Sequence, residues 1–589
     1  MASNAIRRAQ PRETVRVTIN KTLILEGPLG TTIGAFFAEA ARELSSDVPI
    51  IAAICDGQLR ELSYPLNRDS ALEPVLLSQG DGGRIYRRSL VMLLTTAADE
   101  LWPGCQVSVR YSVPDGGFYC TRLDNKPFTP QELEQLETRM REIVAADAPI
   151  TKRLVSLDEA AALFASRGED DKVRLLEQRI RPNLTLYTLR NRSDYYYGYM
   201  VPSTGLLRYF RLIWVRDGFI LQYPVAESPT YLRPLRAYDK LSKVFRQADN
   251  WLQRLEIEDV GRMNRIMQDA NRTHELILVT EALHEQNIAH IAHQISEQHR
   301  QQNTRLVLIA GPSSSGKTTF AKRLAIQLLA HGIRPVMLEL DNYFVDRDLT
   351  PRDEHGEYDF EALGAVNLPL FNQHLLQLSQ GETVQIPRFD FHTGKSRPDR
   401  FLKLKQNQIV IVEGIHGLNP KLVPEVPPHL IYRVYVSALT QLNIDAHNRI
   451  ATTDVRLLRR IVRDARHRGY SATDTLNRWG SVRRGEKLNI FPYQENANIM
   501  FNSALAYELA ALRPLAEPLL LQVEPGTPPH IEAKRLLSFL GWVRPMMPDQ
   551  MRIIPPTSLL REFIGDSSLH EYHPERLEQE TENVVTPTT

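Results

Sequence analysis

Apolar and polar positions alternate near the start of the chain and then take up helical spacing. Apolar residues occupy every second place over 15–19, which predicts a strand. Helical spacing covers 33–44, and a short apolar strand at 49–55 precedes a polar Asp-Gly turn. Residues 14–80 therefore predict a small β-grasp domain, and the polar, basic residues 1–13 before it predict a flexible arm.

Helical and strand patterns are mixed over residues 81–230, which predicts an α+β domain. The segments with helical spacing are 90–101, 130–145 and 157–165. The segments that predict strands are 107–113 and the aromatic-rich stretch 193–223. Residues 231–300 are polar and mostly helical without a Pro or Gly run, so they predict a helical connector.

Strand and helix patterns alternate from residue 301 to residue 545, which is typical of a parallel sheet covered by helices on both faces. The strand candidates are 306–310, 335–340, 409–412, 430–436 and 498–501. The predicted fold class is therefore multidomain α/β, with a doubly wound parallel-sheet domain in the C-terminal half. The chain becomes polar and acidic after about residue 565, and residues 546–589 are predicted to form a largely disordered tail.

The charge balance argues against some classes of partner, and the cysteines argue against some kinds of structural site. Lys and Arg total 71 against 70 Asp and Glu, so no long-range attraction to nucleic acid or to an anionic membrane is expected. Cys55, Cys105 and Cys120 are far apart, which fits neither a disulfide framework nor a zinc finger. The chain shows no signal-peptide pattern and no run near the roughly 20 apolar residues of a membrane helix. We expect a cytoplasmic protein without membrane contact, and a homo-oligomer is compatible with the sequence.

Residues 311–318, Gly-Pro-Ser-Ser-Ser-Gly-Lys-Thr, match the pattern G-x-x-x-x-G-K-[ST] in full. A predicted strand precedes them and a helix-forming stretch follows, which is the context that a phosphate-binding loop requires. The glycines let the backbone turn sharply and direct N–H groups at phosphate oxygens, and the helix N-terminus favours an anion. The residues expected to bind ATP are Gly311, Ser313, Ser314, Ser315, Gly316, Lys317, Thr318 and Thr319.

Two acidic residues directly follow predicted strands. Asp341 comes after the strand at 335–340, and Glu413 comes after the very apolar strand at 409–412. Ligands of an open α/β sheet gather at the carboxyl ends of its strands, where a carboxylate can orient Mg²⁺ or accept a proton from an attacking hydroxyl. Helix capping is the alternative role for both residues.

Five arginines follow one another at helical spacing near the end of the predicted sheet domain. They are Arg456, Arg459, Arg460, Arg463 and Arg466. Spacing of three and four places several guanidinium groups on one helix face, where they can neutralise charge on a transferring phosphoryl group. A solvated face paired with Asp454 and Asp464 is an equally good interpretation of the spacing alone.

Taken together, these motifs resemble the uridine kinase and phosphoribulokinase family over residues 280–525. The segment Leu340–Phe344 resembles the one whose aspartate is that family's general base. Tyr358–Phe360 resembles the segment whose aspartate holds the acceptor sugar, and the strand ending at Glu413 resembles the one with the Mg²⁺-linked glutamate. Residues 456–469 resemble the family's lid helix.

The resemblance implies transfer of the γ-phosphate of ATP to a hydroxyl of a small-molecule acceptor, a nucleoside, at the ribose 5′ position. It implies catalytic roles for Asp341, Lys317, Arg459 and Arg463. It implies acceptor-binding roles for Asp359, Phe389, Arg456 and Arg468, and Mg²⁺ ligands at Thr318 and Glu413.

The acceptor segment 387–395 departs from the family pattern. Its aromatic residues, including Phe389, are present, but the histidine sits earlier than in uridine kinases. A preference for a pyrimidine base does not follow from this segment, and the aromatic residues also fit an ordinary hydrophobic core.

The front half resembles a different family. Residues 14–78 resemble the ubiquitin-like TGS domain of threonyl-tRNA synthetase, and residues 85–225 resemble its editing domain. Two histidines of that editing site are replaced by Arg88 and Met92, and the cysteine and second-pair histidine are replaced by Tyr196 and Met200. Because metal binding and deacylation need such side chains, the resemblance implies no editing activity here.

Three functions remain open at this point. The leading one is an ATP:nucleoside phosphotransferase. The second is a kinase of another sugar or phosphosugar, suggested by the displaced histidine. The third is a non-catalytic, ATP-dependent regulator associated with RNA or tRNA, suggested by the synthetase-like front half, although a charge of +1 lacks the basic footprint that nucleic-acid binding leaves.

Overall fold

The computed structural model describes residues 12–124, 126–352, 356, 358–390, 392–440, 442–572 and 574. The chain divides into two compact units. The first comprises Met1–Arg236, Ile444–Arg449 and Val523–Trp542, and the second comprises Ala237–Asn443, Ile450–Gln522 and Val543–Thr589. Most of the expected flexible arm, residues 1–11, lies outside the described residues.

The first unit begins with a five-stranded mixed sheet in the order β2-β1-β5-β3-β4. Its strands are β1 (Thr14–Ile19), β2 (Leu23–Pro28), β3 (Ile50–Cys55), β4 (Gln58–Glu61) and β5 (Ser70–Leu76). β1 pairs antiparallel with β2 and parallel with β5. The alternating apolar residues of β1 are buried against α1 (Ile33–Glu39). The predicted helix over 33–44 is divided at Ala40, where α1 ends and α2 (Ala41–Leu44) begins.

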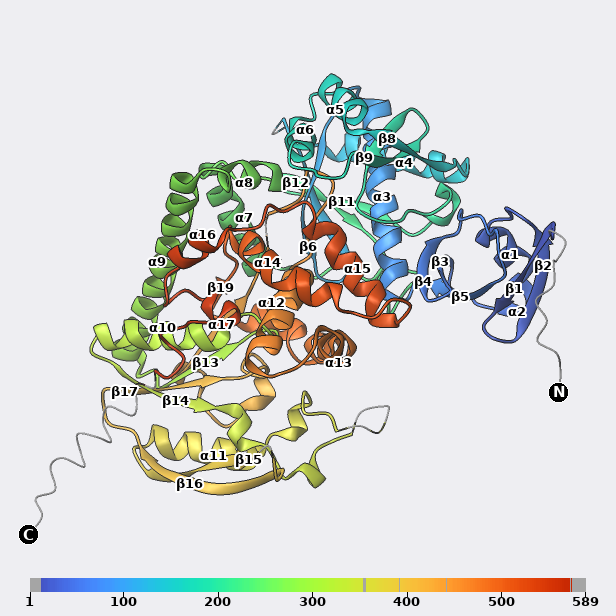
Figure 1. Cartoon of the computed structure of the whole chain (residues 1–589). Coiled ribbons are helices and arrows are strands. Elements are labelled where there is room, and N and C mark those ends of the chain that lie inside the picture. The colour runs from blue at the N-terminus through green and yellow to red at the C-terminus, as the bar shows by residue number, and fades with distance from the viewer. Residues whose placement is uncertain are drawn as a thin grey trace, which may run out of the picture. The chain divides into compact units, whose positions relative to one another are not determined.

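The long helix α3 (Gly80–Leu101) forms the core of the rest of this unit (Figure 1). This part of the unit also contains two antiparallel sheets, with the strand orders β11-β12-β7-β6 and β10-β9-β8. The strands are β6 (Val107–Val113), β7 (Gly117–Arg122), β8 (Ile150–Ser156), β9 (Asn183–Leu189), β10 (Arg192–Tyr195), β11 (Arg211–Val215) and β12 (Gly218–Gln222). The further helices are α4 (Pro130–Ala145), α5 (Leu157–Ser166) and α6 (Asp170–Leu176). The mixed α and β content agrees with the sequence pattern.

α3 begins ten residues before the predicted start at residue 90. Its first turn contains three glycines, which are poor helix formers. A Cβ on Gly82 would lie 2.1 Å from the carbonyl oxygen of Leu76, so the first turn packs on the end of β5 more closely than a larger residue allows. Tertiary packing therefore fixes this helix start.

Two segments from the second half of the sequence belong to the first unit, although both were predicted to lie in the 301–545 domain. The backbone N–H of Val109 donates to the carbonyl of Ala446 at 2.8 Å. Glu532, in α15 (Pro528–Leu540), forms an ion pair with Arg84 at 3.0 Å. These contacts join residues hundreds of positions apart, and local periodicity carries no sign of them.

The second unit contains a five-stranded, all-parallel sheet in the order β14-β17-β13-β18-β19. Its strands are β14 (Arg334–Glu339), β17 (Gln408–Glu413), β13 (Leu306–Ala310), β18 (Ile431–Ser437) and β19 (Ile499–Asn502). Leu306 and Leu308 face a core that includes α11 (Leu368–Ser379), and on the other face Phe320 of α10 (Lys317–Ala330) packs against Phe501. The prediction of a parallel sheet covered on both faces is confirmed.

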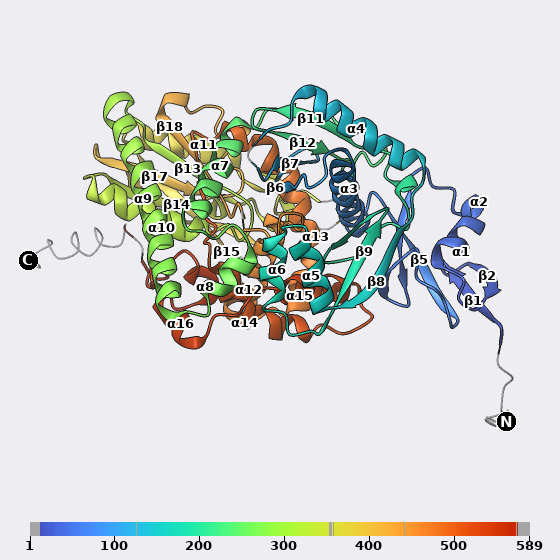
Figure 2. The same cartoon turned by 90° about the horizontal axis from the view of Figure 1, so that it is seen from above.

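The helices between the two halves of the chain belong to the second unit, so they are part of its body instead of a connector. They are α7 (Asp239–Arg254), α8 (Val260–Ile266) and α9 (Ala270–Gln302). α9 lies beside α10 (Figure 2), and Glu285 of α9 forms an ion pair with Arg323 of α10 at 2.6 Å. The helical character of this stretch is confirmed.

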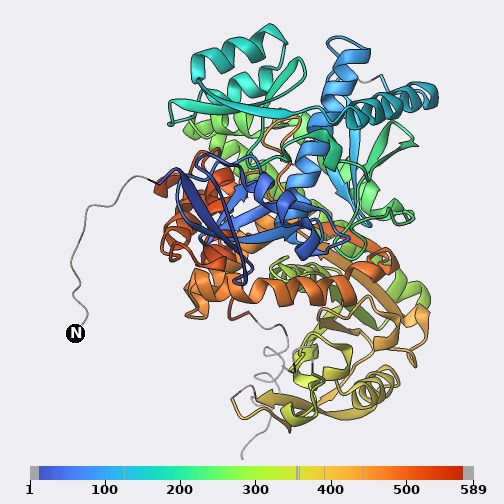
Figure 3. The same ribbon diagram turned by 90° about the vertical axis from the view of Figure 1, so that its right-hand side faces the viewer.

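A two-stranded hairpin, β15 (Thr383–Asp390) and β16 (Lys395–Lys403), extends from the second unit and is yellow in Figure 3. Along the chain, α12 (Thr452–His467) and α13 (Ala472–Asn489) follow β18, and α14 (Glu508–Leu521) follows β19.

The prediction of a largely disordered tail over 546–589 is wrong for its first part. The structure has α16 (Pro548–Ile553) and α17 (Arg561–Ile564) there, and Leu559, Leu560 and Phe563 are buried. These apolar residues pack into the second unit, whereas the polar composition that suggested disorder belongs to the later residues. Residues 575–589 lie outside the described residues.

Candidate active site

The loop at 311–316 joins β13 to α10 and has two residues in the left-handed region. Ser314 has φ 57° and Gly316 has φ 85°. A Cβ on Gly311 would lie 1.9 Å from the carbonyl oxygen of Val436 in β18, so only glycine fits there. The loop therefore turns tightly and opens onto the N-terminus of α10, an arrangement that favours an anion.

Side chains of α12 and α13 form hydrogen bonds to the backbone of this loop. Arg456 donates to the carbonyl of Ser313 at 3.0 Å and forms a buried ion pair with Glu486. Glu486 in turn accepts from the backbone N–H of Ser313 at 3.1 Å. The loop is thus tied to two charged residues that water cannot reach.

A second buried pair supports the next residues of the loop. Arg459 pairs with Glu508 and donates to the carbonyl of Ser503 at 2.8 Å. The Ser503 hydroxyl donates to the carbonyl of Ser315 at 2.5 Å. Arg459 therefore acts on the loop through Ser503.

The predicted metal and base residues lie at the carboxyl ends of β14 and β17. Glu413 is the last residue of β17 and accepts a hydrogen bond from the Thr318 hydroxyl at 2.9 Å. Burial raises the pKa of Glu413 to about 7, and the charge of Lys317 opposes that shift. Burial, followed by repulsion from Glu339, also raises the pKa of Asp341, again opposed by Lys317. The structure therefore brings two carboxyl groups, an exposed one on Asp341 and a half-buried one on Glu413, near the ammonium group of Lys317.

The five arginines do not share one environment. Arg456 and Arg459 are 1% and 0% exposed, so the solvated-face interpretation is wrong for both. Arg460 donates to the hydroxyl of Ser313 at 2.8 Å. Arg463 forms an ion pair with the neighbouring Asp464 at 2.9 Å. Spacing alone could not separate these environments, because buried and exposed arginines follow the same helical period.

Arg468 comes directly after α12, and the side chain is half exposed. It lies 3.7 Å from Asp464, and its charge lowers the pKa of Asp341 against the larger effects of burial and Glu339. Arg468 is therefore near the carboxyl-end cluster, with part of its side chain open to solvent.

Two of the four predicted acceptor-binding residues, Asp359 and Phe389, lie in different segments of the second unit. Asp359 accepts from the backbone N–H of Glu361 at 3.0 Å, so its carboxylate caps a local turn. Phe389 is 3% exposed and meets the ring of Phe344 edge-on at 5.7 Å. The burial of Phe389 agrees with the alternative that it is a core residue.

Glu361 is a half-buried acid that the sequence did not single out. Burial and the nearby charge of Glu486 raise its pKa to about 7, and Lys317 and Arg460 oppose this shift. It follows the predicted acceptor segment by one residue, and no motif distinguishes it.

Glu562 is the second residue that sequence reasoning missed. Its carboxylate accepts from the backbone N–H of Thr319 at 3.1 Å and from the Thr319 hydroxyl at 2.8 Å. Leu559, from the same segment, lies against Gly316, where an added Cβ would come within 2.3 Å of it. Because the acidic C-terminal region was predicted to be disordered, the sequence did not indicate this contact.

The four replaced positions of the editing-like region form ordinary structure in the first unit. Met92, Tyr196 and Met200 are buried in its hydrophobic core. Arg88 donates to the carbonyl of Tyr199 at 2.7 Å. Residues 151–230 contain no histidine, yet His447 lies in this unit and contacts Asp194 at 2.8 Å.

Residues 306–509 match the model of the phosphoribulokinase/uridine kinase family. This part of the chain is therefore similar to that kinase family, in agreement with the resemblance of its motifs. None of the helices in the described part of the chain has both the length and the apolar character needed to cross a membrane.

The N-terminal region matches threonine–tRNA ligases. Those of Burkholderia ambifaria and Burkholderia multivorans are 41% and 39% identical to this chain over 165 residues, which are 28% of this chain and 26% of each ligase. The chain therefore spans about a quarter of the length of the curated relatives it matches.

Two solved kinase structures are similar to part of the chain. A possible uridine kinase from Bacillus stearothermophilus shows 17% identity and a TM-score of 0.23, over 33% of this chain and 88% of that one. D-glycerate 3-kinase from Cryptococcus neoformans var. grubii shows 16% identity and a TM-score of 0.19, over 48% and 89%. Scores this low carry no argument about the acceptor.

Proposed function

We propose that the protein is an ATP-dependent phosphotransferase that phosphorylates a hydroxyl of a nucleoside, at the ribose 5′ position. The observation that carries this proposal is the gathering of Lys317, Asp341 and Glu413 beside a phosphate-binding loop. The match of residues 306–509 to a kinase family supports the same reaction class.

The residues present fit ATP and Mg²⁺. The loop 311–316 leaves no room for a side chain at Gly311 and ends at a helix N-terminus, as a phosphate cradle requires. The hydroxyl of Thr318 and the carboxylate of Glu413 are 2.9 Å apart and supply the oxygen ligands that Mg²⁺ prefers. When bound, the metal neutralises charge on the transferred phosphoryl group.

The proposed roles follow from position and charge. Asp341 accepts the proton of the attacking hydroxyl, for which its raised pKa makes it a better base than an ordinary aspartate. Lys317, Arg463 and Arg468 stabilise negative charge that develops on the phosphates. Asp359 and Phe389 border the acceptor.

Arg456 and Arg459 were expected to contact the substrate or the reacting phosphate. Both form ion pairs with buried glutamates and are hydrogen-bonded to loop carbonyls or to Ser503. We therefore propose that they are positioning residues that hold the loop.

The alternative acceptor is another sugar or a phosphosugar, favoured by the displaced histidine at position 392. A non-catalytic, ATP-dependent regulator associated with RNA or tRNA is the third candidate. It is favoured by a 165-residue match to threonine–tRNA ligases and disfavoured by the near-zero net charge.

For the front half we propose a TGS-like β-grasp domain at 14–80 and an editing-like domain at 81–230 that has lost deacylation. Burial of Met92, Tyr196 and Met200 in the core supports this loss, because the positions that would carry catalytic side chains are packed. We propose a cytoplasmic location for the protein.

The test is ADP release from ATP and Mg²⁺ in the presence of nucleosides, ribose derivatives and phosphosugars, with Lys317→Ala as the blank. Release that one nucleoside stimulates and the blank lacks supports the proposal and names the acceptor. Stimulation by a phosphosugar alone transfers support to the second candidate. ATP binding without stimulation by any acceptor supports the regulator.

A further inference from the structure

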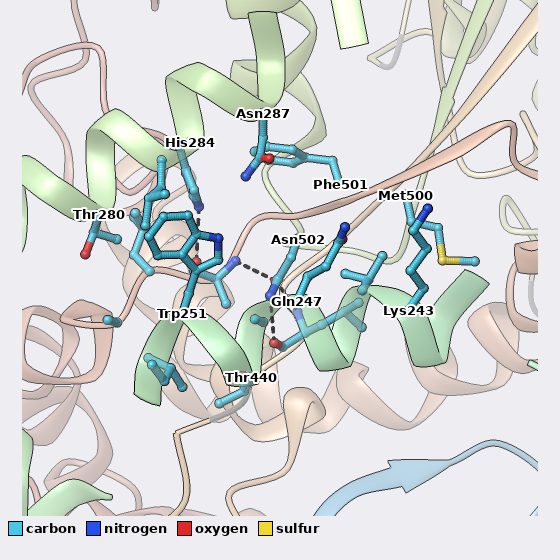
Figure 4. A pocket seen from close by; sticks show the side chains of 18 of the residues that line it. Lys243, Gln247, Trp251, Thr280, His284, Asn287, Thr440, Met500, Phe501 and Asn502 are labelled. Carbon is cyan, nitrogen blue, oxygen red and sulfur yellow. Dashed lines mark hydrogen bonds between the residues drawn. The ribbon is translucent and has the colours of Figure 1, made fainter. Parts of the chain in front are cut away.

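A cavity of about 420 Å³ lies in the second unit between α7, α9 and the segment around 498–509 (Figure 4). Its lining contains no residue of the 311–318 loop. Cavities of this size are typical of sites for small metabolites. The cavity is therefore separate from the candidate active site.

Helices α7 and α9 contribute polar and aromatic side chains to this cavity, in each case from one face of the helix. Lys243, Gln247 and Trp251 are four residues apart along α7. Thr280, His284 and Asn287 are four and three residues apart along α9. Such spacing places each set on one face of its helix. A helix–helix contact that serves packing alone would have apolar residues at these positions.

Two buried polar atoms of this lining lack a hydrogen-bond partner among the described residues, Thr280 Oγ1 and His284 Nδ1. His284 Nε2 lies 3.1 Å from the carbonyl of Ala504 and must donate to it, so Nδ1 is left as an acceptor. Burial and the charge of Arg323 lower the pKa of His284 to about 3, which keeps the ring neutral. An unpartnered buried polar atom is costly, so a ligand with a donor group at this place would stabilise the fold.

The remaining side chains define the chemistry that would complement them. Gln247 and Asn287 each offer one amide donor group and one carbonyl acceptor, the pairing that recognises the edge of a nucleobase. The indole of Trp251 provides a stacking surface. Lys243 adds a positive charge at the lining, whereas Glu508, which also lines the cavity, is neutralised by Arg459.

We propose that this cavity is a second, non-catalytic binding site that takes a nucleoside monophosphate. The base lies between Trp251 and the amides of Gln247 and Asn287, and the phosphate is directed to Lys243. His284 Nδ1 accepts a hydrogen bond from an N–H or O–H group of the ligand.

One chain segment both lines the cavity and forms a hydrogen bond to the phosphate-binding loop. Asn502 and Ala504 line the cavity, and Ser503 between them donates to the carbonyl of Ser315. A ligand in the cavity therefore contacts the segment that holds the loop. Binding at the two sites is expected to be coupled, and thermodynamic linkage makes the coupling equal in both directions.

The experiment is isothermal titration of the full chain with AMP and UMP, with adenosine, uridine and inorganic phosphate as separate arms. It uses wild type, Lys317→Ala, the double variant Gln247→Leu/Asn287→Leu, and Lys243→Met. Gln253→Leu, an exposed substitution on the same helix α7, is the matched control. Binding of ADP to the double variant verifies that the fold and the phosphate-binding loop are intact.

The expected result is binding of a monophosphate that Lys317→Ala and Gln253→Leu retain and the double variant weakens at least tenfold. Lys243→Met should weaken the monophosphate and leave the nucleoside unchanged. The proposal is overturned if no arm binds, if the double variant binds as wild type does, or if Lys317→Ala abolishes binding. The last result would assign the ligand to the phosphate-binding loop, and inorganic phosphate alone binding as well as AMP would also overturn the base-specific site.

Discussion

The carboxylate of Glu562 accepts hydrogen bonds from both the backbone N–H and the hydroxyl of Thr319, at 3.1 and 2.8 Å. These donors belong to the first turn of α10, directly after the phosphate-binding loop. A phosphate bound at this helix N-terminus would use the same donors. After burial, which is the largest cause, the charge of Glu562 also helps to raise the pKa of Glu413. If the proposed ATP site is correct, carboxylate and phosphate would compete for the same hydrogen-bond donors.

Replacing Glu562 by Gln should strengthen binding of ADP. The amide removes a negative charge from the place that a phosphate would take, and a tenfold gain corresponds to about 1.4 kcal/mol. Titration calorimetry with ADP and Mg²⁺ measures the effect, and Glu571→Gln, at an exposed position, is the control. Equal or weaker binding by Glu562→Gln would show that the carboxylate does not compete with the nucleotide.

Asp341→Asn should lower kcat by about 100-fold or more, the usual loss on removing a general base. The KM for ATP should stay within a few-fold, because Asp341 is not part of the loop. Activity of the wild type should fall as the pH falls through the raised pKa of Asp341, since the base must be ionised to accept a proton. The acid limb of the pH profile should then lie above the ordinary aspartate range and be absent from the residual activity of Asp341→Asn. An unchanged profile in the variant would assign the base to another residue.

Glu361→Gln should stabilise the protein at high pH only. The pKa of Glu361 is raised from an ordinary 4.5 to about 7, first by burial and then by Glu486. The folded state therefore holds this proton more tightly than the unfolded state, and the resulting stability is present below 4.5 and lost as the pH rises through 7. The variant's Tm should exceed that of wild type at pH 8.5 and approach it at pH 5. A gain of the same size at both values would contradict the assignment.

Breaking the buried pair of Arg459 and Glu508 should destabilise the second unit strongly. Removal of one partner from a buried pair costs about 3–5 kcal/mol, because the other charge is left uncompensated. Arg459→Met should therefore lower the free energy of unfolding more than the double variant Arg459→Met/Glu508→Leu does. Urea unfolding of the single and double variants measures the coupling. If the two losses simply add, the pair does not act as a unit.

Much of the sheet domain could be predicted from the sequence, because fully buried strands are continuous apolar runs. β13 has the predicted bounds, and each end of the other four strands is displaced by one residue from its predicted position. Asp341 and Glu413 could be placed because the carboxyl ends of parallel strands meet at one edge.

The rest depended on contacts between distant segments. Glu562 reaches Thr319 across 243 positions, and no local pattern marks it. Arg459 has the same helical spacing as an exposed arginine, so its burial against Glu508 could not be read from spacing. The segment Ile444–Arg449 joins the first unit for the same reason.

Asp194 in the first unit is fully buried and contacts both Lys172 and His447. Although burial opposes the charged form, Lys172 and then His447 hold the pKa of Asp194 well below its usual range. Asp194→Leu leaves the ammonium of Lys172 without its nearest carboxylate, and a loss of about 3–5 kcal/mol in unfolding free energy is expected.

Hydrogen exchange separates a local effect from general unfolding. In Asp194→Leu the amides of residues 444–449 should exchange faster, because His447 has lost the carboxylate that holds it in the first unit. Lys172→Met is the matched variant, since it removes a cation but leaves Asp194 in contact with His447 and near Arg192. Exchange at 444–449 should therefore change less in Lys172→Met than in Asp194→Leu. Equal protection of this segment in wild type and Asp194→Leu would mean that its backbone contacts, such as the one from Val109 to Ala446, suffice to hold it.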